Sequence, residues 1–551
     1  MLARSNNCWR QLTEDQGTTM KFDTIISGGT VIDGTGTPGA QVDIGISGKE
    51  IAAIGDLSES TSDNAIDATG LTVTPGFIDV HAHSDGALLL DGQHASGIRQ
   101  GVTTEILCPD GLSYAPLSHD DYLMYRKYLS GILGFPPEDL DMSSIDAFLS
   151  NYHLKTSCNV ATFIGHGPVR ISAVGMNDVP LRGADMDRAK GMLREGLEQG
   201  ARGFSTGMSY YPNAYSDTDE LVELCEVAAE FGLPYSTHLR NHNPERGYAG
   251  GGVLEALEIG RRSGVPVHLE HYRTAPPHIG DIASIMDPVD AAKAEGVDVS
   301  LECYVYPVGS SFPHTFIPGW VHEGGSDAMM ERLLDLETRK DLIKFFQETP
   351  ITPMGGNMFT AISEGPNDDL VGMTFEDAAE AKGTSVEELV MELMVEEEMG
   401  IGFRGIPPTS VRVWRQHEED VMNLLDRPDY MIGSDSIPIA PPLVGIVHPR
   451  AFGCFARFIG RLRRRFDRPL EQVIQRVTQN PAQRFKIDKR GVIAEGNFAD
   501  LVLFNADTVN DQSSFEDPAV HPSGIPYVFV NGKLAVENEK VTGVLAGEAV
   551  R

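Results

Sequence analysis

Two histidines separated by one residue end the stretch 74-TPGFIDVHAHSD-85, near the start of the chain. The stretch opens on a Thr-Pro-Gly turn and continues with apolar residues, which predicts a β-strand over residues 77–83. Side chains two apart on a strand share a face, so we expect His81 and His83 to project to the same side. A lone strand histidine is usually a core residue. A neighbouring pair on a strand end suits a zinc-like ion, which lowers the pKa of bound water and polarises a carbonyl group.

The strand that carries this pair is the first of eight in the middle of the chain. Between residues 76 and 490, short apolar segments alternate with helical stretches that close on glycine, the pattern of an α/β fold with a TIM-like (β/α)8 barrel. The segments end in DVHAH, TTEILCPDG, VATFIGHG, ARGFSTGMSY, PYSTHLRN, VPVHLEHYR, VSLECYVYP and YMIGSDS. Active sites of this fold are built at the C-terminal ends of the strands, so polar residues there should converge.

Three further ligand-type side chains follow the later strands. His238 ends the fifth segment, His271 the sixth and Asp435 the eighth. Four imidazoles and one carboxylate suit a zinc-class ion, or two ions if a group bridges them. We expect Asp435 to take a proton from water and pass it to a leaving nitrogen, although an Asp in GSDS also fits a helix N-cap. His268 ranks below His271 because it lies further from the end of the same strand.

The residue pattern at both ends of the chain differs from that of the middle. Residues 20–75 and 491–551 contain short β segments separated by Gly, Asp and Ser turns, with a hairpin turn expected at Asn531-Gly532, and predict one small β-sandwich built from both termini. Residues 1–19 lack this pattern and are expected to be a disordered extension. The stretch 312–357 is too long for a plain loop of the barrel and is predicted to be a lid.

Charge and cysteine usage narrow the class of protein. A net charge of −35 argues against nucleic acid and anionic membrane surfaces as partners. The 6 cysteines show no framework spacing, and no apolar run is long enough for a membrane helix. The sequence therefore predicts a cytoplasmic protein with a small-molecule substrate, and a homo-oligomer is compatible with it.

Several stretches together resemble one branch of the amidohydrolase superfamily, the N-acyl-D-amino-acid deacylases (D-aminoacylases). They include TPGFIDVHAHSD, FIGHGPVR, GFSTGMSYYP, STHLRN, LEHYR, ECYVYP, MIGSDS, HPRAFGCFAR and GVIAEGNFADLVLF, and the resemblance runs from about Lys21 to Gly543. It implies a metal-dependent hydrolase that releases a free D-amino acid from its N-acyl derivative. It also implies metal ligands at His81, His83, His238 and His271, with Asp435 as the metal-linked acid and base.

The chain departs from this family after the second strand. The family usually has Asn-Cys-Gly there, with the cysteine as a zinc ligand, whereas this chain reads Cys108-Pro109-Asp110-Gly111. Alignment on the following GLSYAP puts Asp110 in the place of the cysteine, so we predict Asp110 as the replacement ligand and Cys108 as a buried apolar residue. An oxygen ligand also makes manganese or cobalt compatible with the site, and leaves one ion or two open.

A second departure concerns the substrate. Arg273 stands where the family commonly has lysine, and its planar fork suits the substrate α-carboxylate. Tyr210 and Tyr304 match family tyrosines near the substrate and are predicted to donate to a carboxylate or an oxyanion, with core packing as the alternative. Arg450, in HPR, is expected to be a structural or loop-closing residue.

Two other functions fit the sequence less well. A cyclic-amide hydrolase of the hydantoinase kind shares the barrel and the histidine pair, but it bridges two metals with a carboxylated lysine, and the second, third and fourth strand ends contain no lysine. A catalytically silent scaffold would be expected to lose ligands, and this chain keeps them.

Overall fold

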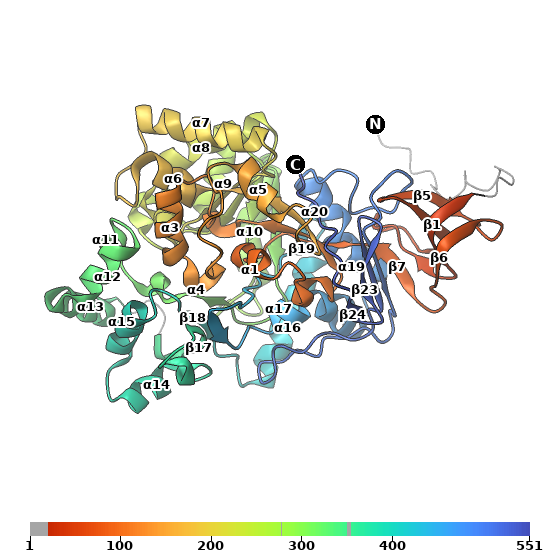
Figure 1. Cartoon of the computed structure of the whole chain (residues 1–551). Coiled ribbons are helices and arrows are strands. Elements are labelled where there is room, and N and C mark those ends of the chain that lie inside the picture. The colour runs from red at the N-terminus through yellow and green to blue at the C-terminus, as the bar shows by residue number, and fades with distance from the viewer. Residues whose placement is uncertain (1–19, 277, 350–353) are drawn as a thin grey trace.

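The computed structural model describes residues 20–276, 278–349 and 354–551 (Figure 1). Within these residues eight parallel strands form a closed barrel. The strands are β8 (Phe77–Asp79), β9 (Val102–Leu107), β10 (Asn159–Thr162) continued by β11 (Ile164–Gly165), β12 (Phe204–Gly207), β13 (Tyr235–His238), β14 (Val267–Leu269), β15 (Val299–Cys303) and β19 (Tyr430–Ile432). A parallel bridge between Ala82 and Ser436 joins the first strand to the last. All eight predicted segments contribute barrel strands. The first is shorter than the predicted 77–83, because it ends at Asp79 and His81 and His83 follow it on either side of the Ala82 bridge. The predicted extension over residues 1–19 lies outside the described residues.

Helices connect consecutive strands around the outside of the barrel. They include α2 (Ala95–Ile98), α5 (Ile145–Tyr152), α7 (Ala184–Glu198), α8 (Thr218–Glu230), α9 (Gly252–Ser263), α10 (Ile282–Ala294), α16 (Val411–Leu425) and α19 (Leu470–Val477). Three of them end just before Gly200, Gly232 and Gly264, which all have positive φ, the helix stop that the sequence predicts. None of the helices in the described ranges is long and apolar enough to cross a membrane.

The two ends of the chain meet in a small β-sandwich beside the barrel (Figure 1). Strand β7 (Thr72–Pro75) pairs antiparallel with β21 (Leu501–Phe504), so a single seven-stranded sheet contains strands from both end segments of the chain. A four-stranded sheet built around β1 (Lys21–Ser27) packs on it through a shared apolar core. The hairpin between β22 (Tyr527–Val530) and β23 (Lys533–Glu537) turns at residues 531–532, as predicted.

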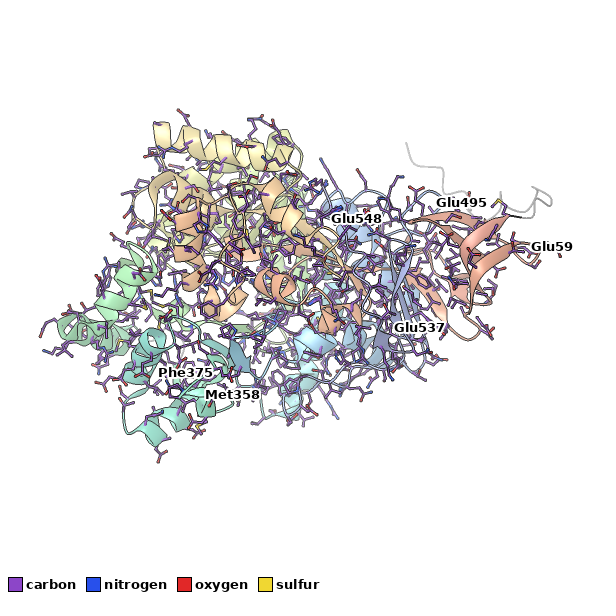
Figure 2. The ribbon with its side chains drawn as sticks, viewed as in Figure 1. Glu59, Met358, Phe375, Glu495, Glu537 and Glu548 are labelled. Carbon is purple, nitrogen blue, oxygen red and sulfur yellow. The ribbon has the colours of Figure 1, made fainter. Side chains whose placement is uncertain are left out.

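A long excursion separates the seventh barrel strand from α16. It contains β16 (Ser310–Ser311), α11 (Gly319–His322), α12 (Ser326–Leu334), α13 (Leu336–Glu348), β17 (Asn357–Ser363), α14 (Phe375–Lys382), α15 (Val386–Glu396) and β18 (Gly402–Gly405). Its strands form one sheet with β20 (Leu443–Gly445), which follows the eighth barrel strand and pairs with β17. Figure 2 shows Met358 and Phe375 of this excursion at the opposite end of the molecule from Glu59 and Glu537 of the sandwich. The predicted lid segment, 312–357, is the first half of the excursion.

A buried ion-pair network anchors α6 (His166–Val174), the helix after the third strand, to α8. Glu220 lies against Arg170 and His166 and also accepts a hydrogen bond from the Leu181 amide at 2.9 Å. Burial alone would raise the pKa of Glu220, but Arg170 and His166 outweigh it and lower the pKa to about 2. A carboxyl group whose pKa is lower in the folded than in the unfolded state stabilises the fold above its unfolded pKa.

Replacing Glu220 by Gln is therefore expected to lower the free energy of unfolding by about 3 kcal/mol at neutral pH. The loss should shrink as the pH falls from about 4.5 towards 2, because wild-type Glu220 is then protonated as well. Urea unfolding of both proteins between pH 3 and 7 measures this. Glu223→Gln, on the same helix but in a partly exposed pair with Lys190, is the control and should change stability by less than about 1 kcal/mol.

Candidate active site

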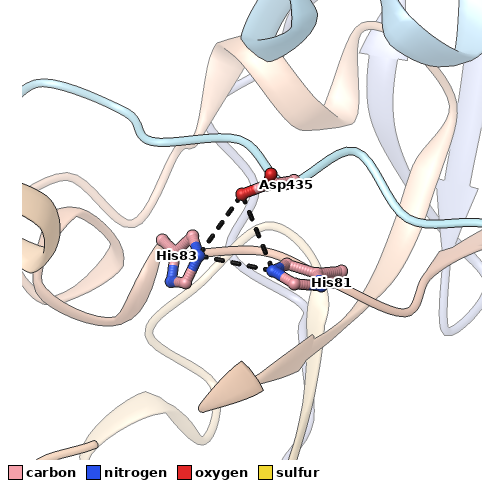
Figure 3. Close-up of side chains that lie close together, drawn as sticks. All are labelled: His81, His83 and Asp435. Carbon is pink, nitrogen blue, oxygen red and sulfur yellow. Dashed lines mark hydrogen bonds and ion pairs between the residues drawn. The ribbon is translucent and has the colours of Figure 1, made fainter. Parts of the chain in front are cut away.

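His81, His83 and Asp435 meet where the first and eighth barrel strands end (Figure 3). The two Nε2 atoms are 3.3 Å apart, and Asp435 Oδ1 lies 3.6 Å from His81 Nε2 and 3.4 Å from His83 Nε2. Ligand atoms around a tetrahedral zinc ion, each about 2.0–2.1 Å from it, are separated by roughly 3.3–3.4 Å. The three side chains therefore already have the mutual spacing of a divalent-metal site.

Asp79 holds the ends of the first and eighth strands together from inside the barrel. Its buried carboxylate accepts hydrogen bonds from the His81 amide at 3.2 Å, from the Ser434 amide at 2.9 Å and from the Ser434 hydroxyl. The Asp435 amide in turn donates to the His81 carbonyl at 2.8 Å. One aspartate thus holds the strand with the histidine pair against the turn with Asp435.

Asp110 lies at the centre of all four predicted histidine ligands. Its Oδ1 is 3.8 Å from His81 Nε2, 3.7 Å from His238 Nδ1 and 3.6 Å from His271 Nε2. Its Oδ2 is 3.5 Å from His83 Nε2. His81, Asp110 and His271 form a second group with metal-ligand spacing. A carboxylate in this position can bridge two ions.

Three of the predicted ligands have strained backbone conformations. Asp110, His271 and Asp435 have φ values of 58°, 35° and 52°, in the left-handed region that residues other than glycine rarely adopt. Such strain persists only where the surrounding structure imposes it, and it is concentrated at functional sites. Each of these residues follows a barrel strand, so the sharp turn of the backbone brings its side chain over the mouth of the barrel.

The donor set fits a divalent cation. Burial would raise the pKa of Asp110, yet His81 and His238 hold it well below its usual range, so the group is a carboxylate. Asp110 Oδ1 is buried without a hydrogen-bonding partner among the described residues. Nitrogen ligands with two carboxylates suit zinc, and manganese or cobalt remain compatible.

Arg450 makes an ion pair with Asp435 that the sequence did not indicate. Arg450 Nη1 lies 2.8 Å from Asp435 Oδ2, and both residues are buried. Burial alone would raise the pKa of Asp435, but Arg450 and His81 hold it far below its usual value. Arg450 also donates to Ser310 Oγ at 2.9 Å. Beyond the structural role expected for it, this arginine orients the side chain that is predicted to carry the proton.

The three predicted substrate-binding side chains line the same mouth. Arg273 Nη2 donates to the Tyr304 hydroxyl at 2.8 Å, and the Arg273 and Arg450 guanidinium carbons lie 4.5 and 4.6 Å from the centre of the Tyr304 ring. The Tyr210 ring lies 5.1 Å from the ring of His238. The structure thus brings Arg273, Tyr210 and Tyr304 to the edge of the histidine cluster.

The first residues of the excursion cover the site, and we call residues 309–312 the roof. A β-carbon on Gly309 would lie only 2.9 Å from the Tyr304 hydroxyl and 3.6 Å from Arg450 Nη1, so a residue without a side chain allows this close approach. Ser310 bonds Arg450, and Phe312 stacks on Tyr210 with ring centres 5.8 Å apart. The roof thus connects the arginine side of the site to the tyrosine side.

Comparisons with known proteins agree with this geometry. The model of a family described as amidohydrolase matches residues 64–316 and 376–536. The D-aminoacylase of Alcaligenes xylosoxydans xylosoxydans is 31% identical over 97% of this chain and 99% of its own. The chain is an amidohydrolase of the N-acyl-D-amino-acid deacylase family.

Two solved structures of this family extend the comparison to the metal centre. A D-aminoacylase with a binuclear metal centre superposes with a TM-score of 0.76 at 30% identity, covering 96% of this chain and 100% of that one. The N-acyl-D-glutamate deacylase of Bordetella bronchiseptica, complexed with zinc and a phosphonate that mimics the tetrahedral intermediate, gives 0.77 at 29% identity with the same coverage. The predicted zinc-type cofactor is confirmed at the level of the family.

At the end of the second strand the structure separates the two candidate ligands, Cys108 and Asp110. Cys108 is fully buried away from the histidines, with Sγ 3.2 Å from Asp85 Oδ1 and 2.9 Å from Ser113 Oγ. Asp110 stands among the histidines instead. His268, which ranked below His271, bonds Ser300 at 2.8 Å deeper in the barrel.

Glu302 is a further member of the site that sequence reasoning missed. The His81 Nδ1–H donates to Glu302 Oε1 at 2.9 Å, and the His271 amide donates to the same oxygen at 2.6 Å. A carboxylate only accepts, so it places the proton on Nδ1 and leaves Nε2 of His81 free to bind an ion. The signal in the sequence was the alternation in VSLEC, which puts this carboxylate inside the seventh strand.

Glu302→Gln is expected to weaken zinc binding about 10- to 100-fold, because His81 loses the partner that fixes its tautomer and orientation. Competition with a chromophoric chelator measures the affinity. Glu418→Gln, which alters a buried carboxylate paired with Arg457 outside the site, is the control. Equal zinc affinity in Glu302→Gln and wild type would contradict the role of Glu302.

Proposed function

We propose that this chain hydrolyses the amide bond of N-acyl-D-amino acids to a carboxylate and a free D-amino acid. The observation that carries the proposal is Asp435, held by Arg450 within 3.6 Å of two paired histidines in a chain of the deacylase family. The residues that would hold the metal are His81, His83, Asp110, His238, His271 and Asp435. When bound, a divalent ion supplies a water of lowered pKa and positive charge for the scissile carbonyl.

Asp435 performs the proton transfers in this proposal. Its low pKa keeps it ionised at neutral pH, so it can accept a proton from the attacking water. Arg450 keeps one carboxylate oxygen occupied, which leaves Oδ1 directed at the histidines. The same carboxyl group then gives the proton to the leaving nitrogen, and the D-amino acid departs as the free amine.

Arg273, Tyr304 and Tyr210 orient the substrate in this proposal. Arg273 forms no ion pair with any carboxylate of the described residues, and its fork suits the α-carboxylate of the substrate. Tyr304, bonded to Arg273, and Tyr210 are positioned to donate to that carboxylate or to the developing oxyanion. The roof covers the site and keeps bulk water from the reacting amide.

The test is release of free amine from matched N-acetyl-D- and N-acetyl-L-amino acids, with added zinc and with a chelator. Chelator-sensitive release from the D series alone is the expected result. Release from neither series would overturn the proposal and direct attention to cyclic amides. That rival has no support from the geometry, because Asp110 rather than a lysine stands among the histidines.

We also propose a cytoplasmic location. A homo-oligomer is a separate proposal, which light scattering would test. The five cysteines of the described chain are all buried and unpaired, as expected in a reducing compartment. The sixth, Cys8, lies outside the described residues.

A further inference from the structure

We propose that the small β-sandwich takes part in catalysis through one short segment, residues 511–515, which holds Arg450 in place against Asp435. We call this segment the strap. The inference rests on the proposed deacylase function, because it assigns a positioning role within that reaction. Arginine has many side-chain rotamers, so a fixed ion pair with Asp435 requires that both the backbone and the guanidinium group of Arg450 be held.

The strap is part of the loop between β21 and β22 of the seven-stranded sheet. An antiparallel bridge between Asn510 and Ser523 closes the base of this loop. Inside the loop, the Ser514 amide donates to the carbonyl oxygen of Asp517 at 3.0 Å. The loop is therefore a folded projection of the sandwich, which can hold a neighbouring element in place.

The strap packs on α17 (Arg450–Ala456), which lies between the excursion and the strands of the sandwich in Figure 1. The buried Ser513 hydroxyl is 3.0 Å from the carbonyl oxygen of Pro449, just before the helix, although the two residues are 64 positions apart. Arg457 follows the helix, and its Nη1 lies 2.9 Å from Asp511 Oδ2 in a buried ion pair. The strap thus contacts both ends of the helix whose first residue pairs with Asp435.

Phe515, the last residue of the strap, reaches the backbone of Arg450 through His448. The rings of Phe515 and His448 are 5.0 Å apart and meet edge to face. The Arg450 amide donates to His448 Nδ1 at 3.1 Å, and His448 Nε2–H donates to the carbonyl oxygen of Val308 at 3.0 Å. Burial keeps the pKa of His448 well below its usual value, so the ring is neutral and both of its nitrogens are used. Phe515 therefore supports a ring that is bonded to the Arg450 backbone.

Phe515 also reaches the guanidinium end of Arg450, through the roof. The Arg404 guanidinium carbon lies 4.9 Å from the centre of the Phe515 ring, and Arg404 Nη2 donates to the Phe515 carbonyl oxygen at 3.3 Å. Arg404 is the register partner of Ser310 in the pairing of β18 with β16. Ser310 Oγ in turn accepts a hydrogen bond from Arg450 Nη2 at 2.9 Å. The strap thus holds Arg450 at both ends of its side chain.

Loss of the Phe515 ring removes the surface on which His448 and Arg404 rest. Arg450 then spends less time in the position that orients Asp435, so a smaller fraction of the enzyme is ready for proton transfer. The metal ligands and Arg273 make no contact with Phe515, so metal binding and substrate binding are unchanged. The expected signature is a loss in kcat with little change in KM.

The experiment measures kcat, KM and metal content of the zinc-loaded full-length enzyme with N-acetyl-D-amino acids. Phe515→Ala is expected to lower kcat about tenfold or more, with KM within about threefold and the metal content of the wild type. Phe498→Ala is the matched control, because Phe498 is another half-buried phenylalanine near the sandwich sheets, with the Arg490 guanidinium carbon 4.4 Å from its ring centre. It should keep kcat within about twofold.

A double-mutant cycle separates positioning from general destabilisation. Arg450→Met lowers kcat by itself, because it removes the partner of Asp435. In that background, Phe515→Ala should lower kcat by less than about threefold further, since the group through which Phe515 acts is gone. Losses that multiply in the double variant would overturn the inference, as would near-normal kcat in Phe515→Ala, provided that circular dichroism shows each variant to be folded.

Two further measurements cover the remaining outcomes. If Phe515→Ala does not fold, Phe515→Leu keeps an apolar side chain without the aromatic faces, and the same pattern is expected from it. No turnover by the wild type would overturn the deacylase function instead. A crystal structure of the Phe515 variant then tests the strap alone, because the Arg450 guanidinium carbon should leave its place 4.6 Å from the Tyr304 ring centre. An unmoved Arg450 would overturn the inference.

Discussion

Replacement of Asp435 by Asn is expected to lower kcat about 1,000-fold or more, because the amide cannot accept the proton of the attacking water. The change is nearly isosteric, so the contacts of the strand end with His81 and Ser436 remain. The side-chain charge is lost, however, and Arg450 is left buried without its partner. Breaking a buried ion pair costs about 3 kcal/mol or more, so some loss of stability accompanies the loss of activity.

The measurement is kcat for N-acetyl-D-amino acids together with circular dichroism and thermal unfolding at the assay temperature. Asp426→Asn is the matched control, because Asp426 ends α16 in a largely exposed pair with Arg468. That variant should retain wild-type activity. A folded Asp435→Asn protein with near-normal turnover would eliminate the proton-transfer role of this residue.

The second large effect is expected from Asp110. Asp110→Ala removes the carboxylate that approaches all four histidines within 3.8 Å, and it leaves their nitrogens without the central negative charge. We expect the purified variant to retain less than half of the metal of the wild type and to lose at least 100-fold in kcat/KM. Metal content by mass spectrometry and activity with added zinc measure the two losses.

Asp110→Cys separates the loss of a ligand from a change of ligand. A thiolate in this place supplies a soft sulfur donor, which favours zinc over manganese or cobalt. The Cys variant should therefore keep its metal and show a higher ratio of zinc- to manganese-supported activity than the wild type. Full metal content in Asp110→Ala would show that Asp110 is not a ligand.

Patterns that are local in the sequence determined much of this protein. The alternation of apolar strands and glycine-closed helices predicted the barrel, since strand and helix periodicity and the stop at Gly232 or Gly264 depend on neighbouring residues. The predicted hairpin turn at Asn531 is also local. The convergence of the histidine pair was predicted from strand geometry, and the two Nε2 atoms do meet at 3.3 Å although the strand itself ends at Asp79.

Only the tertiary structure decided which distant groups join these ligands. Glu302 lies 221 positions from His81, and Arg450 and Asp435 meet through a loop whose path no periodicity specifies. The sequence favoured Asp110 over Cys108 as a metal ligand only through an alignment. In the structure, the left-handed backbone at both residues directs the Asp110 carboxylate to the histidines and the Cys108 thiol to the core. Such contacts depend on barrel closure and on loop conformations. The sequence therefore predicted which ligand-type residues lie at the strand ends, whereas tertiary packing determined which buried residues hydrogen-bond to them and orient them.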